Sequence, residues 1–117
     1  MVEVIVTYNF KEWYLDLEES DADAVTRVVE LLEEKGTALS FPYTSAITGS
    51  RYPLRELRVQ SGGKPLRVFY AFDPIRQAVL LLGGDKTGDK RFYARLVPQV
   101  EAIWVAYLRD FAAGERE

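Results

Sequence analysis

The 117-residue sequence contains no cysteine and no histidine. Without cysteine, the chain has no disulfide framework, no thiolate zinc site and no cysteine nucleophile. Without histidine, it lacks the side chain that most often serves as a general acid or base near neutral pH, and the commonest metal ligand. We therefore expect no metal site and no cofactor, and any catalysis must depend on carboxylate, lysine, arginine or tyrosine side chains.

Long apolar runs are missing as well. No apolar stretch approaches the roughly 20 residues that cross a bilayer, and the first residues, MVEVIVTYNFKEW, lack the basic start and apolar core of a signal peptide. The composition, with 48% hydrophobic and 28% charged residues, is that of an ordinary globular protein. We expect one domain over residues 1–117, acting in the cytoplasm without contact with a membrane.

Acidic and basic residues are unevenly distributed along the chain. The formal net charge is −3, which by itself disfavours a nucleic-acid partner. Residues 1–48, however, hold 3 basic and 10 acidic groups, whereas residues 49–98 hold 10 basic and 4 acidic groups. The first segment thus carries −7 and the second +6, so we expect the middle of the chain to build a basic face. The alternative is that acid-rich helices near the N-terminus account for the asymmetry.

Hydrophobic periodicity predicts a strand followed by two helices at the start of the chain. The β-branched run at residues 2–8, VEVIVTY, is typical of a strand. Asn9 is the expected cap of a first helix, and Asp21 or Asp23 is expected to open a second helix that ends near Gly36. Apolar side chains recur at helical spacing in the first helix and define its buried side: Phe10, Trp13, Tyr14 and Leu17.

The rest of the chain predicts a meander of three strands and a C-terminal helix. Residues 37–53 show no periodicity and are expected to form a connecting loop. Strands are expected at residues 54–60, 66–73 and 77–82, and the short turns SGGK and DPIR imply antiparallel pairing. Asp89 is expected to open a final helix that Pro98 kinks or divides. The predicted fold is an α+β domain of order β-α-α-β-β-β-α, with a mainly antiparallel four-stranded sheet and the helical hairpin on one face.

Strand alternation brings basic side chains together on one face of the predicted sheet. Glu56 and Arg58 share a face of their strand, and Arg67 is expected to point out from the sheet, away from the packed helices. Lys86 follows the last strand, and Arg91 lies at the start of the last helix. These residues predict a concave cationic surface whose natural ligand is a phosphate backbone.

The residue types in this group suit the cleavage of RNA. Attack of a ribose 2′-hydroxyl on the neighbouring phosphate needs a base, an acid for the leaving oxygen, and cations for the charge-rich transition state. Because arginine stays protonated at physiological pH, Arg58 and Arg67 are candidates for stabilising that charge. The candidates for proton transfer are Glu56, Lys86 and Tyr93, and Tyr93 could instead stack on a base.

Each of these residues also has a purely structural interpretation. Glu56 could simply pair with a strand arginine, Lys86 could be a solvated turn residue, and Tyr93 could belong to the core. Arg55 is more typical of a surface charge than of a ligand contact. The glycine pairs lack the following Gly-Lys-Ser/Thr of a phosphate-binding loop, and the aspartates of GGDKTGD lack the spacing of a calcium loop.

The order of motifs along the chain is more specific than any single residue. PLRELR, as the end of ITGSRYPLRELR, is followed by RVFYAFD and LLLGGDK in this order, after FKEWYLDL and before FY at the start of a helix. This pattern covers nearly the whole chain and resembles the RelE/ParE toxin superfamily, most of all its HigB-like, phage-derived branch. The resemblance implies the RelE-like fold and a small ribonuclease that cleaves mRNA, usually on a translating ribosome. It also implies a cognate antitoxin as inhibitor, often a helix-turn-helix protein.

The resemblance further implies which residues act. The residues that match the family's functional positions are Arg67 before VFY, Arg58 in the preceding strand, Lys86 after the last strand, and Tyr93 or Arg91 in the last helix. Arg55, Lys90 and Arg91 are expected to contact RNA. Because residues 1–48 carry −7, an acidic antitoxin segment is expected to bind near Arg58, Arg67 and Lys86 instead.

Two features of the sequence depart from the family. The histidines of some relatives are absent, and the net charge is acidic, whereas many ribosome-dependent members are basic. Two alternatives to an mRNA endoribonuclease therefore stay open. The chain could be a non-catalytic inhibitor of a protein target such as gyrase, as in ParE-like members, or an RNA-binding homologue without turnover.

Overall fold

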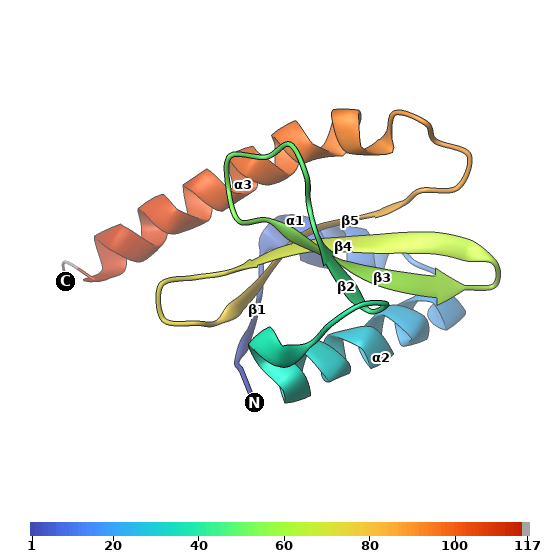
Figure 1. Cartoon of the computed structure of the whole chain (residues 1–117), viewed down its shortest axis with the longest axis horizontal. Coiled ribbons are helices and arrows are strands. Elements are labelled where there is room, and N and C mark those ends of the chain that lie inside the picture. The colour runs from blue at the N-terminus through green and yellow to red at the C-terminus, as the bar shows by residue number, and fades with distance from the viewer. Residues whose placement is uncertain (116–117) are drawn as a thin grey trace.

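A five-stranded sheet forms the middle layer of the molecule, and helices lie on both of its faces (Figure 1). The computed structural model describes residues 1–115. The strand order is β1-β5-β4-β3-β2, with β1 parallel to β5 and all other pairs antiparallel. The strands are β1 (Val4–Val6), β2 (Thr44–Ala46), β3 (Arg55–Ser61), β4 (Lys64–Phe72) and β5 (Ala78–Asp85). The α+β class and the predicted meander are confirmed, and the first strand lies at one edge.

The strand count differs from the prediction because residues 37–53 are not only a loop. They include the end of a short 3₁₀ helix, Gly36–Ala38, and the edge strand β2. The Thr44 hydroxyl donates to the Glu56 carbonyl at 3.0 Å and lies 2.6 Å from the Tyr70 hydroxyl. A three-residue strand is too short to produce a sequence period, and these buried polar contacts hold it in place.

Two helices cover one face of the sheet, as predicted. They are α1 (Tyr8–Leu15) and α2 (Glu19–Lys35). The cap of α1 is Thr7, not Asn9, because the Thr7 hydroxyl accepts from the Phe10 N–H at 3.3 Å. Helix α2 begins at Glu19, one residue after Glu18 and before either predicted aspartate. These helices share a core with the sheet, formed by a set of buried apolar residues: Phe10, Ala24, Val25, Leu32, Leu57, Val59, Leu66, Val68, Tyr70 and Leu80.

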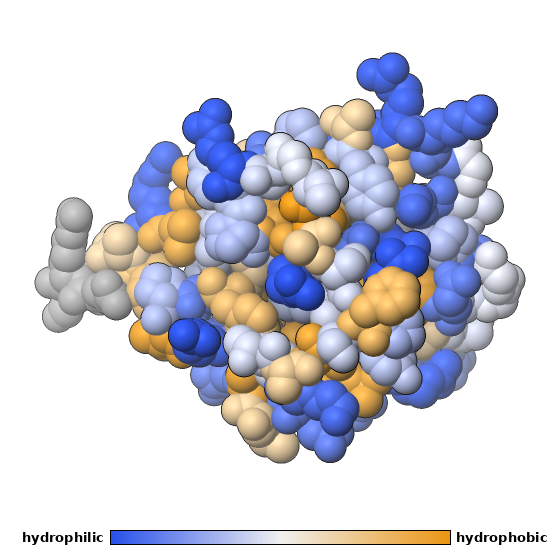
Figure 2. All heavy atoms as spheres, viewed as in Figure 1, coloured by the Kyte–Doolittle hydropathy of each residue, from blue (hydrophilic) through white to orange (hydrophobic). Residues whose placement is uncertain are grey.

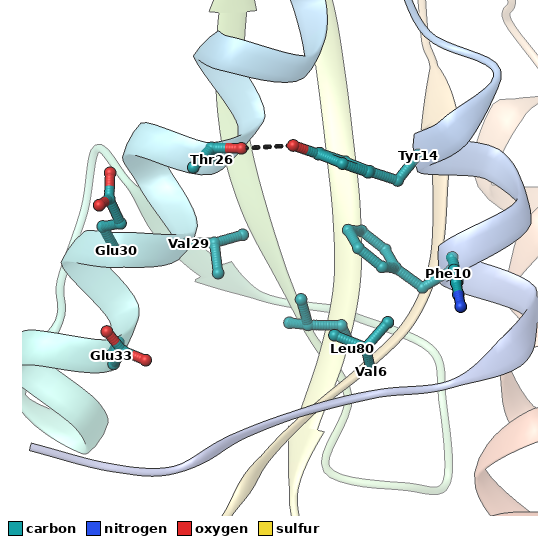
Figure 3. A pocket seen from close by; sticks show the side chains of 9 residues that line it. Val6, Phe10, Tyr14, Thr26, Val29, Glu30, Glu33 and Leu80 are labelled. Atoms are coloured by element: carbon teal, nitrogen blue, oxygen red, sulfur yellow. Dashed lines mark hydrogen bonds between the residues drawn. The ribbon is translucent and has the colours of Figure 1, made fainter.

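An open apolar pocket remains between these two helices (Figure 3). Its volume is about 230 Å³, and Phe10 and Tyr14 of α1 face Val29 of α2 across it. The Tyr14 hydroxyl lies 2.7 Å from the Thr26 hydroxyl and bridges the helices at one end. The predicted aromatic stripe of α1 is therefore only partly buried: Phe10 is in the core, and Tyr14 is half-exposed.

Helix α3 (Phe92–Glu115) packs against the other face of the sheet. Phe92, Val100 and Trp104 of α3 are buried there, with Phe69 and Leu81 from the sheet. The helix starts at Phe92 instead of Asp89, and it runs unbroken through Pro98, so the expected division is wrong. Pro98 has no N–H and so removes one backbone hydrogen bond, the one that would reach the Ala94 carbonyl, and the helix continues past it. Of the helices within residues 1–115, none is both long and apolar enough to cross a membrane.

Two consecutive glycines allow both helical layers to approach the sheet closely. Gly83 and Gly84 belong to β5, which continues three residues beyond the predicted strand. A Cβ atom at Gly83 would overlap the Trp13 ring of α1, and one at Gly84 would come within 2.8 Å of the Phe92 ring of α3. Phe92 is thereby seated against the sheet, and its neighbour along the helix, Tyr93, is fixed in position.

Candidate active site

Glu56 is the centre of a polar cluster on the face of the sheet that α3 also covers. It lies in β3, directly opposite Phe69 of β4 and Ser45 of β2, and it is 4% exposed. Its Oε1 accepts from the Tyr93 hydroxyl at 2.7 Å, and its Oε2 accepts from the Ser45 hydroxyl at 2.9 Å. The carboxylate therefore joins β2, β3 and α3 at one point.

The same carboxylate lies between two arginines. Arg58 and Arg67 are direct cross-strand partners on β3 and β4, an arrangement in which like charges repel. Glu56 compensates both charges: Oε1 lies 3.5 Å from Arg67 Nε, and Oε2 lies 3.7 Å from Arg58 Nη1. The distances thus confirm the suggestion from the sequence that the side chains of Glu56, Arg58 and Arg67 lie together.

Arg67 differs from the prediction in its exposure. It was expected to point away from the packed helices, but it is 5% exposed, because the start of α3 covers this end of the sheet. Its Nη1 donates to the Leu66 carbonyl at 3.1 Å. Among the buried side-chain nitrogen and oxygen atoms of residues 1–115, Arg67 Nε is the one without a hydrogen bond. Arg67 is therefore a buried cation whose charge depends on Glu56 for compensation.

Tyr93 and Lys86 form the outer part of the cluster. Tyr93 is the second residue of α3, and the Lys86 Nζ lies 5.1 Å from the centre of its ring, as a cation–π pair does. Burial raises the pKa of Tyr93, the hydrogen bond to Glu56 raises it further, and the neighbouring Arg67 opposes the shift. The phenol is therefore protonated at neutral pH and donates to Glu56.

The cluster has a net positive charge and an adjoining pocket. Two arginines flank the Glu56 carboxylate, and Lys86 lies over the ring of Tyr93, so Arg58, Arg67, Lys86 and Glu56 together carry a net charge of +2. A pocket of about 350 Å³ opens beside it and is lined by Val28, Pro42, Tyr43, Arg58, Gln60, Pro65 and Arg67. Figure 2, with β2 toward the viewer, shows hydrophobic and hydrophilic residues interleaved on this side of the molecule. Such a surface can hold an anion with an attached planar apolar group.

Three predicted RNA contacts lie outside the cluster. Arg55 is opposite Tyr70, so its side chain is on the α1–α2 face of the sheet. Lys90 and Arg91 are exposed at the start of α3, and within residues 1–115 no ion pair connects them to Glu56.

The cationic surface is also smaller than the charge count suggests. Lys64 pairs with the buried Asp21 of α2, and Arg95 pairs with Asp89. Lys64 and Arg95 are both among the 10 basic groups of residues 49–98. Hydrogen bonds from Lys64 and then Ser61 lower the pKa of Asp21, which is therefore ionised at neutral pH. These two pairs hold elements together and leave fewer cations for a ligand.

Sequence reasoning missed Ser45 and the aromatic residues before it. Ser45 contacts Glu56 only because β2 exists, and the aperiodic segment gave no indication of that strand. Phe41 was also missed, although its ring lies 5.5 Å from the Arg58 guanidinium. The one available signal was the run FPY, which is unusually apolar for a connecting loop.

Comparisons with known proteins place the chain in a family. Residues 12–104 match the family described as "Phage derived protein Gp49-like (DUF891)". The chain is 38% identical over 108 residues to "Putative toxin HigB3" of Mycobacterium tuberculosis (strain ATCC 25618 / H37Rv), an alignment that covers 88% of this chain and 93% of that protein. It is 33% identical over 102 residues to "Putative toxin HigB2" of the same strain, covering 85% of this chain and 51% of that protein.

The fold has a solved counterpart. A mutant of the Escherichia coli toxin RelE in the free state superposes with a TM-score of 0.60 over 84% of this chain and 96% of that chain. The two sequences are 9% identical, so this likeness concerns the fold alone. Together with the sequence matches, it shows that the chain belongs to the family of phage-derived Gp49-like proteins and is a toxin of the HigB type with a RelE-like fold.

Proposed function

We propose that this toxin is an endoribonuclease that cleaves mRNA at the Glu56 cluster without a metal ion. The observation that supports the proposal most is the buried carboxylate between two arginines, beside an accessible lysine–tyrosine pair. This arrangement supplies fixed positive charge where a phosphate would bind. The reaction needs no Lewis acid, because Arg58, Arg67 and Lys86 are themselves cations.

The chemistry is an intramolecular transesterification. The ribose 2′-oxygen attacks the adjacent phosphorus, the bond from phosphorus to the 5′-oxygen breaks, and a 2′,3′-cyclic phosphate and a free 5′-hydroxyl result. One proton leaves the 2′-hydroxyl and one is added to the 5′-oxygen, so the reaction neither adds protons to the enzyme nor removes any from it. The phosphorane between these states carries extra negative charge, which the half-exposed Arg58 contacts directly and Arg67 stabilises from behind.

Glu56 acts as a positioning group in this proposal. Both of its oxygens already accept hydrogen bonds, and it is buried against Arg67. A carboxylate held in this way orients the two guanidinium groups, and each of its oxygens is already engaged by a hydroxyl of the protein. Tyr93, whose phenol is protonated at neutral pH, is therefore assigned the donation of a proton to the leaving 5′-oxygen. Water takes the proton of the 2′-hydroxyl and solvent reprotonates the phenol, while Lys86 stays a cation beside the phosphate.

A matched pair of arginines tests the proposal. Arg58 and Arg55 are both half-buried in β3, but only Arg58 contacts the cluster. Arg58→Ala should restore colony formation on induction and remove new mRNA 5′ ends in primer extension, while Arg55→Ala stays toxic. Arg67→Ala should also abolish toxicity, but because Arg67 is buried, circular dichroism must first show that the variant folds.

Other outcomes of this experiment identify the competing functions. DNA damage without new 5′ ends would indicate a gyrase inhibitor of the ParE kind. RNA binding without any cleavage by the parent would indicate a binding homologue without turnover. Equal toxicity of Arg58→Ala, Arg67→Ala and the parent would show that the cluster is not the site.

The proposal extends to partners. A toxin of this activity would act in the cytoplasm on ribosome-bound mRNA, and a cognate helix-turn-helix antitoxin would hold it inactive. We propose that an acidic antitoxin segment covers Arg58, Arg67 and Lys86, since the acidic α1–α2 hairpin repels such a segment. Hydrogen exchange on the complex should show protection within residues 54–95. Protection confined to residues 10–35 would instead indicate binding at the apolar pocket between α1 and α2.

A further inference from the structure

Exposed aromatic side chains adjoin the Glu56 cluster. Within residues 1–115, the exposed aromatic residues are Tyr8, Phe41 and Tyr43, and two of these three lie in the segment that leads into β2. Phe41 is 72% exposed and Tyr43 is 45% exposed. Single exposed apolar residues are common on protein surfaces, but this pair borders the only guanidinium of the cluster that solvent reaches readily, that of Arg58.

The aromatic segment is held rigidly. The Tyr43 N–H donates to the Ser40 carbonyl at 3.1 Å, and the Tyr43 carbonyl accepts from the Arg58 N–H at 2.8 Å. The next residue, Thr44, is 1% exposed and hydrogen-bonded to β3 and β4. An exposed ring on a fixed backbone loses little conformational entropy when a planar ligand stacks on it.

The pocket beside the segment combines three kinds of group. Tyr43 and Pro42 supply flat apolar walls, Arg58 and Arg67 supply positive charge, and the exposed Gln60 supplies an amide that both donates and accepts hydrogen bonds. Its volume of about 350 Å³ is near the lower end of the usual range for small-ligand sites. A nucleotide has the matching parts: a planar base, a hydrogen-bonding base edge and a phosphate.

We propose that this pocket is a base-binding subsite, in which one unpaired RNA base stacks on Tyr43 while its phosphate contacts Arg58. The subsite rests on the proposed ribonuclease function and extends it, because it fixes which nucleotide flanks the cleaved bond. Gln60 meets the edge of the base and contributes to sequence preference. The Phe41 ring stacks on the Arg58 guanidinium and orients it toward the phosphate.

The test is a double-mutant cycle in which one change is a substitution in the protein and the other is the removal of one base from the RNA. Short single-stranded 2′-O-methyl RNA, which cannot be cleaved by 2′-attack, is titrated with protein at 0.1 M salt and followed by fluorescence anisotropy. For the parent, an abasic nucleotide at one position should lower the affinity about 5- to 150-fold, the equivalent of about 1–3 kcal/mol for one stacked base. Tyr43→Leu, which keeps apolar bulk without a ring, should lose the same factor on intact RNA and nothing more on the abasic RNA.

Two controls and two outcomes complete the experiment. Tyr43→Phe keeps the ring and Tyr8→Leu changes an exposed tyrosine on α1, so both should bind like the parent. If the abasic lesion costs Tyr43→Leu as much as it costs the parent, the subsite is wrong while the ribonuclease proposal stands. If the parent binds no RNA and yields no new mRNA 5′ ends, the ribonuclease proposal fails and the subsite fails with it.

Discussion

Replacing Glu56 by glutamine tests whether one carboxylate holds the cluster together. Glu56→Gln keeps the shape of the side chain and an amide that can still bond the Tyr93 and Ser45 hydroxyls. It removes the negative charge next to Arg58 and Arg67. Arg58 is half-exposed, so water compensates most of its loss. Arg67 is 5% exposed, and within residues 1–115 its one ion pair is with Glu56.

The size of the effect follows from this burial. Two unit charges about 3.5 Å apart attract by roughly 4–5 kcal/mol at an effective dielectric constant of about 20. Removing one partner of a buried pair costs about 3–5 kcal/mol in other proteins. Because the amide retains the hydrogen bonds, we expect Glu56→Gln to lower the free energy of unfolding by about 3 kcal/mol. For a domain of this length that corresponds to a decrease in Tm of about 9–15 °C.

Urea denaturation followed by circular dichroism measures this change. Glu34→Gln, an exposed glutamate of α2, serves as the matched control and should change the free energy of unfolding by less than about 0.5 kcal/mol. In a double-mutant cycle, Glu56→Gln in the Arg67→Met background should cost about 2 kcal/mol less than in the parent. A coupling energy below about 0.5 kcal/mol would refute the inference that Glu56 stabilises a buried Arg67.

Three further predictions concern the scaffold. Gly83→Ala should destabilise the fold by about 1–3 kcal/mol, because its Cβ overlaps the α1 layer, whereas Gly114→Ala, with open space around it, should be neutral or stabilising in thermal denaturation. Thr26→Val should cost about 1 kcal/mol, because it leaves the Tyr14 hydroxyl unpaired, and should not change toxicity. Burial alone would raise the pKa of Asp73, but hydrogen bonds donated to its carboxylate lower it below 3.8. The stabilising effect of the Asp73 carboxylate is therefore complete above about pH 4 and is lost as the pH falls further. The urea midpoint of Asp73→Asn should then depend less on pH between 2 and 5 than that of the parent protein.

The central pairing of the site could be predicted from the sequence because one turn determines it. Gly62 and Gly63 both have positive φ values, of 55° and 82°, and form a two-residue turn in which Ser61 faces Lys64. Three residues further from that turn, Arg58 must face Arg67. Period-two alternation then puts Glu56 on the same side. Local rules were sufficient here because a tight hairpin has only one register.

The environment of Arg67 could not be obtained in the same way. Alternation shows which residues share a face of a strand, but it does not show which faces helices will cover. The apolar run Val79–Leu80–Leu81 in β5 is the signal that was overlooked, because a strand buried on both faces is apolar without alternation. Correctly interpreted, it predicts that α3 covers the second face and that Arg67 is buried beneath its start.

The acidic net charge and a cationic site are compatible because the sheet separates them. The acid-rich helices α1 and α2 pack on the face opposite the Glu56 cluster. The Debye length at 0.1 M ionic strength is about 10 Å, so charges of those helices that lie farther than this from the cluster are largely screened. In the proposed complex, an RNA phosphate at Arg58 therefore experiences mainly the charges within a few ångströms, those of Arg58, Arg67 and Glu56. The overall charge of −3 thus bears on the solubility of the chain and, in the proposed function, on long-range encounter with RNA, while the net charge of +2 on the cluster acts on a ligand at short range.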